Sequence, residues 1–435
     1  MSQKLKIILI VVLVLGALLI GVYFYNKSRG VGTDPNATVY QKFNPFGTST
    51  KVPVTTKVDP NTGEQIIDDT GIKQTEIIKL HKLTDFAVAG ATYFEETKPI
   101  IASTETVIPT TADVVKNNPI KNDILGNVKP SFELIPSLRY VEKSTGHIYQ
   151  MTINTKSAGK ISNSTVPSVN EVIFDGKADS LIYRYVSFDN TSITSFITSI
   201  KNKTGFFLSS DITNISLSPD KNAYFTIIKN TNGVNGFINY FDNTKSSKVF
   251  TSPFSEWSSQ WSTLNTIFLT TKPSYLVEGS IFSLNTKTNT LSKIFGEVYG
   301  LTTLANNDGT KILFGASLEK GPKLNTFDIK NHTSTDLDTY GLPEKCVWSI
   351  NNIYVYCAVP NTVIGTQYPD SWYQGLISFD DRFIKINTVT KEVTTLTNSS
   401  SSNVNIDGTN LFLDKNESNL FFINKKDGTL WSLDL

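Results

Sequence analysis

The chain has 435 residues, with 40 basic and 39 acidic side chains and a net charge of +1, and it is long enough for a large core with additional segments. Charged residues make up 18% of the sequence, below the ~25% of an average globular protein. This balance gives no basic stripe, which excludes nucleic acid as an expected partner.

Residues 7–25 form an apolar run without a charged side chain, with Lys6 before it and Lys27 after it. A helix of about 20 apolar residues spans the hydrocarbon core of a membrane. A cleaved signal peptide has a shorter apolar region and a small-residue cleavage site, which the exit YFYNKSRG lacks. Residues 1–25 are therefore predicted to be an uncleaved transmembrane signal anchor. Basic residues flank both ends, so charge bias alone does not decide the orientation; the short N-terminus favours placing the rest of the chain outside the cytoplasm.

Residues 26–75 are rich in Thr, Pro, Gly, Val, Asp and Asn and show no sustained hydrophobic period. A segment of this composition buries too little apolar surface to offset the entropy of ordering it. We therefore predict a flexible stalk between the membrane anchor and a domain formed by residues 76–435.

A tight turn between two apolar, β-rich runs recurs about every 44 residues through the C-terminal two-thirds of the chain, with one longer step before the last turn. A repeat of ~40–45 residues with several short strands is typical of a β-propeller blade. Such a blade cannot bury both faces of its sheet alone, so blades stack radially around a central channel. The turns are Asp175-Gly176, Asp220-Lys221, Leu264-Asn265, Asp308-Gly309, Asn351-Asn352 and Asp407-Gly408.

The last repeat ends at its third strand, because the chain ends at Leu435. Residues 76–82 have the pattern of an outer strand, and we predict that they complete the C-terminal blade, which would join the two ends of the ring and cover a sheet edge. The result is an all-β propeller of seven four-stranded blades, while six or eight also fit because the first repeat is distorted. The blades are expected to begin near residues 83, 167, 210, 254, 297, 341 and 400.

The two cysteines, Cys346 and Cys357, lie in one predicted hairpin whose loop is Asn351-Asn352. That loop places the two thiols directly opposite each other on adjacent strands, within the usual Cα separation of a disulfide. Two reduced, buried cysteines are the alternative, and a one-residue shift of the loop would separate the thiols. The register and an oxidising location favour the disulfide.

Two long insertions interrupt the repeat. Residues 95–136 separate the first two strands of the first blade, and loops beyond ~12–15 residues are usually functional or disordered. Residues 360–382, between the second and third strands of the sixth blade, carry Tyr368, Trp372 and Tyr373. Because aromatic side chains on a rigidly held loop are favoured at recognition sites, this loop is the candidate binding site. In the alternative, Trp372 folds back on its own blade or fills the channel.

The segment SLSPDKNAYFTII (residues 216–228), with the strand from Gly236 that follows it, resembles the repeat of TolB-type and WD-repeat-like propellers. ANNDGTKILFGAS and NIDGTNLFLD match it more weakly. The resemblance covers roughly residues 83–435; it implies the fold and a role as a binding scaffold, and it carries over no functional residue. The anchor, stalk and propeller together also resemble the layout of single-pass bacterial surface proteins.

The sequence contains no nucleotide-binding or catalytic fingerprint, and its three histidines lack metal-ligand spacing, so no catalytic residue, metal or cofactor is expected. The leading hypothesis is a non-enzymatic, membrane-anchored propeller at the cell surface that binds a protein, peptide or glycan. One alternative is an envelope-assembly factor that works with membrane machinery. Another is a hydrolase of surface glycans, which requires two carboxylates facing each other about 5–9.5 Å apart.

Overall fold

The structure, a computed structural model, describes residues 57–58, 65–66, 79–99, 131–187, 192–397 and 404–435. It divides into two compact units, Met1–Glu76 and Ile77–Leu435. In the first unit, the described residues form an antiparallel pair of two-residue strands, β1 (Lys57–Val58) and β2 (Gln65–Ile66). The anchor predicted at residues 7–25 lies outside the described residues, and no helix within the described ranges is long and apolar enough to cross a membrane.

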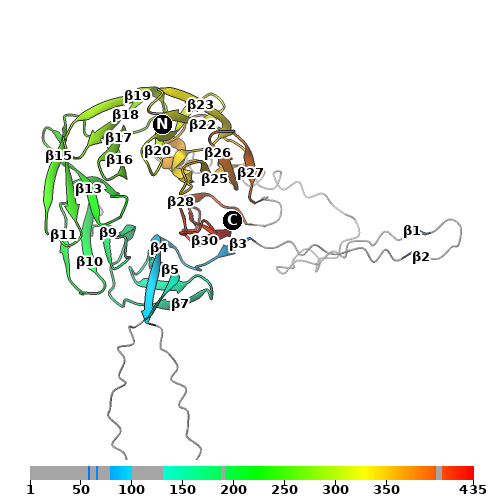
Figure 1. Cartoon of the computed structure of the whole chain (residues 1–435), viewed down its shortest axis with the longest axis horizontal. Helices are drawn as coiled ribbons and strands as arrows, with labels where there is room; N and C mark the ends of the chain where they lie inside the picture. Colours follow the sequence, from blue (N-terminus) through cyan, green and yellow to red (C-terminus); the bar gives the residue numbers. More distant parts are fainter. Residues whose placement is uncertain (1–56, 59–64, 67–78, 100–130, 188–191, 398–403) are drawn as a thin grey trace, which may run out of the picture. The chain divides into compact units, whose positions relative to one another are not determined.

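In the second unit, the described residues form seven four-stranded antiparallel sheets arranged as the blades of a propeller (Figure 1). The first blade contains β4 (Val88–Pro99), β5 (Phe132–Glu142), β6 (Ile148–Thr152) and β7 (Ser157–Lys160). The second contains β8 (Val169–Phe174), β9 (Ser180–Val186), β10 (Ile193–Ser199) and β11 (Gly205–Phe207). The third contains β12 (Ile212–Leu217), β13 (Ala223–Asn230), β14 (Gly233–Tyr240) and β15 (Ser246–Ser252).

The next three blades repeat this arrangement. The fourth contains β16 (Trp257–Thr263), β17 (Thr266–Thr271), β18 (Glu278–Asn285) and β19 (Leu291–Tyr299). The fifth contains β20 (Thr302–Ala305), β21 (Lys311–Leu318), β22 (Gly321–Asp328) and β23 (Thr333–Tyr340). The short 3-10 helix η2 (Pro343–Lys345) leads into the sixth, which contains β24 (Cys346–Trp348), β25 (Tyr354–Pro360), β26 (Asp381–Asn387) and β27 (Val393–Thr395).

The seventh blade joins the two ends of the propeller, as the sequence predicted. It contains β28 (Gly408–Leu413), β29 (Asn419–Asn424) and β30 (Leu430–Asp434), and its outer strand is β3 (Leu80–Lys82). Leu80 pairs with Leu433, and the backbone N–H of Asp434 donates to the carbonyl of Lys79 (2.8 Å). This ladder covers the edge of β30, which would otherwise be open for pairing with another chain.

The apolar core of the propeller is divided among the junctions between neighbouring blades, each of which has its own cluster of buried side chains. Between the third and fourth blades, for example, Phe225 and Phe250 pack with Trp257 and Leu269. Both faces of a blade are thus covered by its neighbours, which explains why the strands read as apolar runs without strict alternation.

In most of the recurring turns between the first and second strands, an Asx side chain accepts hydrogen bonds from the backbone of its own turn, which favours the turn. Asp220 accepts from the N–H of Asn222 (3.1 Å), and Asp308 accepts from the N–H of Thr310 (3.0 Å). Gly309 has a positive φ of 70°, a conformation that glycine adopts without steric cost. The turns therefore reflect local chemistry that the sequence displays directly.

The prediction for the last of these turns, Asp407-Gly408, is wrong. Gly408 begins β28, and the turn between β28 and β29 lies at residues 414–418, where Asp414 accepts a hydrogen bond from the N–H of Ser418 (2.7 Å). Asp407 instead lies fully buried at the entrance to the blade, where it contacts residues that are distant in sequence.

The first predicted insertion is shorter than the sequence indicated. β4 continues to Pro99 and β5 begins at Phe132, and the two strands pair as far as Pro99↔Phe132. Residues 95–99 and 132–136 thus belong to a long hairpin, while residues 100–130 lie outside the described residues.

The connections between strands place the loops on two opposite faces of the ring. Connections between the second and third strands of a blade, and from one blade to the next, lie on one face; we call it the insertion face, because residues 361–380 join β25 to β26 there. The turns between first and second strands and between third and fourth strands lie on the other, the turn face.

Candidate functional site

Residues 361–380, called the insertion below, contain the short helix α2 (Asp370–Tyr373) and extend across the insertion face beyond their own blade. Hydrogen bonds tie the insertion to the fourth, fifth and seventh blades. They run from the backbone N–H of Tyr275 to the carboxylate of Asp370 (2.7 Å), from the hydroxyl of Ser317 to the carbonyl of Thr366 (3.4 Å), and from the ammonium group of Lys425 to the carbonyl of Trp372.

The three aromatic residues predicted as a binding loop have different surroundings. Tyr368 is fully buried and Trp372 is 6% exposed, and both rings stack on Phe379 with centroids 5.7 and 6.3 Å away. Tyr373 is 44% exposed, and its hydroxyl donates a hydrogen bond to the carboxylate of Glu344. Of the three, Tyr373 is the residue whose side chain a partner can contact. Burial of the Tyr368 and Trp372 rings holds the insertion in place, which agrees for Trp372 with the alternative in which it folds back on the blade.

A buried ionic group lies beneath the insertion. The ammonium group of Lys345 contacts the carboxylate of Asp381 (2.8 Å) and that of Asp407. The indole N–H of Trp372 and the backbone N–H of Phe379 each donate to Asp407 (both 3.1 Å). Two residues of the insertion are thus fixed to a carboxylate at the start of the seventh blade.

The pKa values of the two carboxylates in this group are shifted in opposite directions from their ordinary value. Burial raises the pKa of Asp381 to about 6 in spite of the nearby Lys345, and the Oδ1 atom of Asp381 has no hydrogen-bonding partner among the described residues. Burial alone would also raise the pKa of Asp407, but Lys345 and the hydrogen bonds from Phe379 and Trp372 lower it below its ordinary value.

This group is closed to solvent and does not have the geometry of a catalytic site. The side chains of Lys345, Asp381 and Asp407 have no exposed surface, so a substrate atom cannot approach them. Lys345 also lies within 5.2 Å of the ring centroid of Trp372, which encloses the ammonium group from the insertion side.

Several large apolar side chains are exposed on loops and strand ends of the insertion face. We call this set the apolar patch, and it comprises Leu276, Val277, Tyr299, Leu318, Ile364, Tyr373 and Leu376 from the fourth and fifth blades and the insertion. The elements that carry these residues are joined directly, because the N–H of Gly300 donates to the carbonyl of Val277 (3.3 Å), and Ser317, beside Leu318, donates to the insertion. Soluble proteins rarely leave large apolar side chains grouped on one face unless the group binds a partner.

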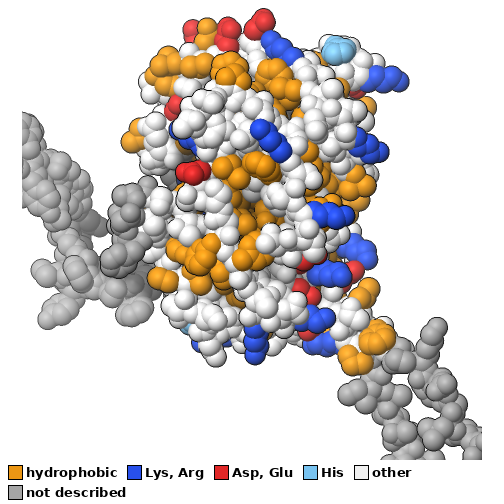
Figure 2. All heavy atoms as spheres, turned by 90° about the vertical axis from the view of Figure 1, so that its left-hand side faces the viewer, with side chains coloured by type: hydrophobic (Ala, Val, Ile, Leu, Met, Phe, Trp, Pro, Cys, Tyr) orange, Lys and Arg blue, Asp and Glu red, His pale blue; other side chains and the backbone are white. Residues whose placement is uncertain are grey.

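The rim of the propeller near β11 and β15 provides a contrast. Figure 2 shows this side, where hydrophobic side chains form several separate groups among uncharged polar side chains and scattered lysines. Isolated exposed apolar residues of this kind are normal for a soluble protein.

Cys346 and Cys357 are direct partners on β24 and β25, and a disulfide joins them. Both are buried, so the bond lies within the core of the sixth blade. Among the described residues, no three His, Cys, Asp or Glu side chains come together as a metal site.

Sequence reasoning missed both the ionic group and most of the apolar patch. Lys345 and Asp381 lie in stretches with no motif, and Asp407 was assigned to a turn. Leu276, Leu318 and Leu376 come from a loop of the fourth blade, the end of β21 and the insertion, so only the circular arrangement of the blades places them on one face. The one usable signal was the insertion itself, whose length and aromatic content marked the correct region of the fold.

No family model and no curated protein sequence matches this chain, but solved structures with similar folds exist. TolB from Acinetobacter baumannii has 12% sequence identity and a TM-score of 0.40 over 58% of this chain and 60% of TolB, so the chain spans about 60% of the length of that protein. The propeller domain of the Trilobed protease from Pyrococcus furiosus has 10% identity and a TM-score of 0.47 over 69% of this chain and 90% of that domain.

An oligogalacturonate lyase in complex with manganese has 9% identity and a TM-score of 0.49 over 69% of this chain and 86% of the lyase. Identities this low concern the fold and not the chemistry. The β-propeller fold of residues 77–435 is established by its own seven four-stranded sheets.

Proposed function

We propose that this chain is a membrane-anchored β-propeller outside the cytoplasm that acts as a non-enzymatic scaffold and binds a protein partner on its insertion-face apolar patch. The observation that carries the proposal is the patch itself. Leu276 and Leu376 are 68% and 74% exposed, while the insertion beneath them is held by buried rings and ions. A rigid apolar surface loses little conformational entropy on binding.

The chemistry of the patch favours a protein with an apolar surface of its own as the occupant. Tyr299 and Tyr373 add large, stiff side chains of the type that dominates binding energy at protein interfaces. Exposed charges of both signs border the patch, because Glu278 follows Val277, and Glu319 and Lys320 follow Leu318. The border thus has no excess of positive charge that would favour a polyanion.

The location outside the cytoplasm is supported by two independent features. The apolar run at residues 7–25 has the length of a membrane span, and a buried disulfide is typical of an oxidising compartment. The predicted stalk of about 50 residues has an r.m.s. reach of roughly 40 Å as a flexible chain, which leaves the propeller free to meet proteins beside the membrane.

Two alternative functions require different features of the molecule. An envelope-assembly factor would bind a membrane protein of the assembly machinery, which the experiment below identifies. A glycan hydrolase needs two accessible carboxylates facing each other; the close pair Asp381 and Asp407 has no exposed surface and is bridged by Lys345, which does not support that alternative.

The test replaces Leu376 with Asp in the full chain and follows partner capture by crosslinking in native membranes. Leu264→Asp is the matched control, because Leu264 is 65% exposed but lies on the turn face. We expect Leu376→Asp to reduce capture of one discrete partner by at least about tenfold. Both variants should keep the melting temperature of the parent, because exposed substitutions usually change stability by under ~0.5 kcal/mol.

Equal capture by both variants would refute the patch as the binding surface. A crosslink from position 376 to a second copy of the chain, or to residues 26–75, would refute the assignment of a separate protein as the occupant. Capture of a membrane-embedded assembly protein would select the envelope-assembly alternative.

A further inference from the structure

The junction between the second and third blades has the smallest apolar core of the ring. Its buried members are Ile182, Ile197 and Tyr224, whereas the described residues at every other junction include at least six buried side chains. Phe206 and Phe241, which continue this core toward the turn face, are only partly buried. Apolar packing between the two blades is therefore sparse toward the turn face, where residues of both blades line a cleft.

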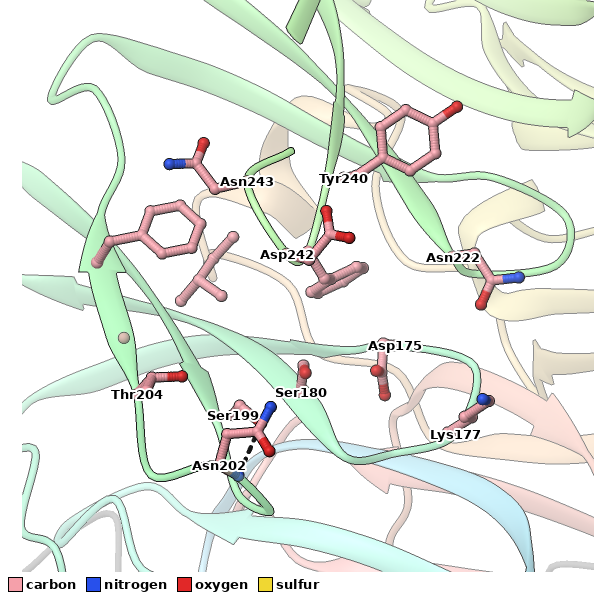
Figure 3. Close-up of a pocket in the computed structure, with 14 residues that line it drawn as sticks. Asp175, Lys177, Ser180, Ser199, Asn202, Thr204, Asn222, Tyr240, Asp242 and Asn243 are labelled. Atoms are coloured by element: carbon pink, nitrogen blue, oxygen red, sulfur yellow. Dashed lines mark hydrogen bonds between the residues drawn. The ribbon is translucent and has the colours of Figure 1, made fainter. Parts of the chain in front are cut away.

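This cleft has a volume of about 670 Å³, within the ~300–1,000 Å³ of small-molecule sites. Figure 3 shows its two walls. The second blade supplies Asp175, Lys177, Ser180, Ser199, Asn202 and Thr204, and the third blade supplies Asn222, Tyr240, Asp242 and Asn243. The cleft lies on the face opposite the apolar patch, so its occupant is independent of the proposed protein partner.

The two carboxylates of the cleft are engaged by their own turns. Asp175 accepts a hydrogen bond from the N–H of Asp179 (2.8 Å), and Asp242 accepts from the N–H and the hydroxyl of Thr244 (3.0 and 2.7 Å). Lys177 is the one cation among the lining residues. The cleft thus has no excess of positive charge with which to hold an anionic ligand.

Its unengaged groups suit a ligand that both donates and accepts hydrogen bonds. The side-chain amide of Asn243 and the hydroxyl of Tyr240 make no hydrogen bond with another described residue, and the Tyr240 side chain is 40% exposed. In Figure 3 the Tyr240 hydroxyl points away from the other labelled side chains, so its ring lies at the edge of the cleft. Amides and hydroxyls can each donate and accept. Phe206 and Phe241 add apolar surface to the same cleft, and Phe241 is held edge-on against Tyr224 (5.2 Å between centroids).

From this combination we propose that the cleft binds a neutral sugar, either free or as the end of a glycan chain. A sugar ring presents hydroxyls at its edge, which match the amide and hydroxyl groups of the walls. It also presents C–H groups on its faces, which pack on aromatic rings such as Tyr240. A uronic acid would place its carboxylate near Asp175 and Asp242 and is disfavoured by repulsion.

The experiment uses the full chain in a detergent without sugar headgroups. Saturation-transfer NMR and calorimetry would be run with glucose, galactose, N-acetylglucosamine and their β-linked disaccharides, and with galacturonic acid as the charged probe. Tyr240→Ala removes the ring and hydroxyl from the cleft, and Asn243→Asp keeps the side-chain size at a residue with a φ of 58°. Tyr299→Ala is the matched control, because Tyr299 is 50% exposed but lies on the insertion face.

We expect at least one neutral sugar to bind, with its affinity reduced by about tenfold or more in Tyr240→Ala and unchanged in Tyr299→Ala. Reduced binding in Asn243→Asp would place the sugar against the third blade. Failure of every neutral sugar to bind at millimolar concentration, binding unaffected by Tyr240→Ala, or tighter binding of galacturonic acid than of galactose would each overturn the proposal. None of these outcomes bears on the apolar patch, which Leu376→Asp tests separately.

Discussion

Lys345 is the residue on which the insertion and two blades depend. It pairs with both Asp381 and Asp407 in a site whose side chains have no exposed surface, and removing one partner of a buried ion group leaves charges without compensation. We expect Lys345→Met to lower the free energy of unfolding by about 3–5 kcal/mol, measured by chemical denaturation.

The matched control for this variant is Lys415→Met. Lys415 pairs with Glu95 at 3.0 Å but is 61% exposed, so its removal should cost no more than about 1 kcal/mol. Adding Asp381→Asn and Asp407→Asn to Lys345→Met should recover part of the lost stability, because the uncompensated charges disappear. A single Lys345→Met variant as stable as Lys415→Met would show that the buried group contributes nothing to the fold.

The ionisation of Asp381 makes the free energy of unfolding depend on pH. Its pKa is raised by burial to about 6 from an ordinary value of 3.8, so the folded protein binds a proton more readily than the unfolded chain between about pH 4 and pH 6. Stability from this residue is therefore greatest below pH 4 and falls as the pH rises to 6. The difference amounts to about 3 kcal/mol at most.

This effect can be measured as the difference between the parent protein and Asp381→Asn from pH 4.5 to 7.5. The parent should lose stability relative to the variant as the pH rises. Asp407 does not oppose this trend within the same pH range. Its pKa is lowered, so the stability that its ionised form contributes is lost only in more acidic solution. Asp380→Asn, at the exposed neighbouring position, should show no such trend; a parallel trend there would assign the effect to another group.

At the scale of elements, β3 carries a prediction about ring closure. Its three residues pair with β30, and Leu80 packs against the core of the seventh blade. Deleting residues 76–82 exposes the edge of β30 and removes that packing, so we expect a loss of about 2–5 kcal/mol in unfolding free energy. Deleting residues 30–60 instead should leave the melting temperature unchanged. Equal stability of the two deletion variants would mean that β3 does not help to hold the ring.

The turns that sequence predicted correctly are those that depend on neighbours in the chain. Turns such as Asp308-Gly309 are specified by a side chain that caps its own backbone. Asp407-Gly408 has the same composition but begins a strand, because Lys345, Trp372 and Phe379 compete for its carboxylate. These partners are 28 to 62 residues away in sequence, so a pattern of neighbouring residues does not predict the contacts.

For the molecule as a whole, the repeat predicted seven blades, their approximate starts and the closing strand, because a periodic sequence imposes a periodic fold. The candidate site was predicted only in part. The length of the insertion indicated which face of the propeller carries the site. The path of the insertion across the ring depends on the burial of Tyr368 and Trp372. The sequence shows that these residues are aromatic, but it does not show that they are buried. The membrane anchor and the location outside the cytoplasm stay predictions.

The pairing of β3 with β30 also sets the order in which the molecule can be completed. Leu80 is among the first residues of the propeller to be synthesised, and its partner Leu433 is among the last. The nascent chain must therefore keep β3 unpaired until β30 has been made, and closure of such distant contacts is slow. A chain that stops before β30 has no strand with which β3 can pair, so its ring stays open.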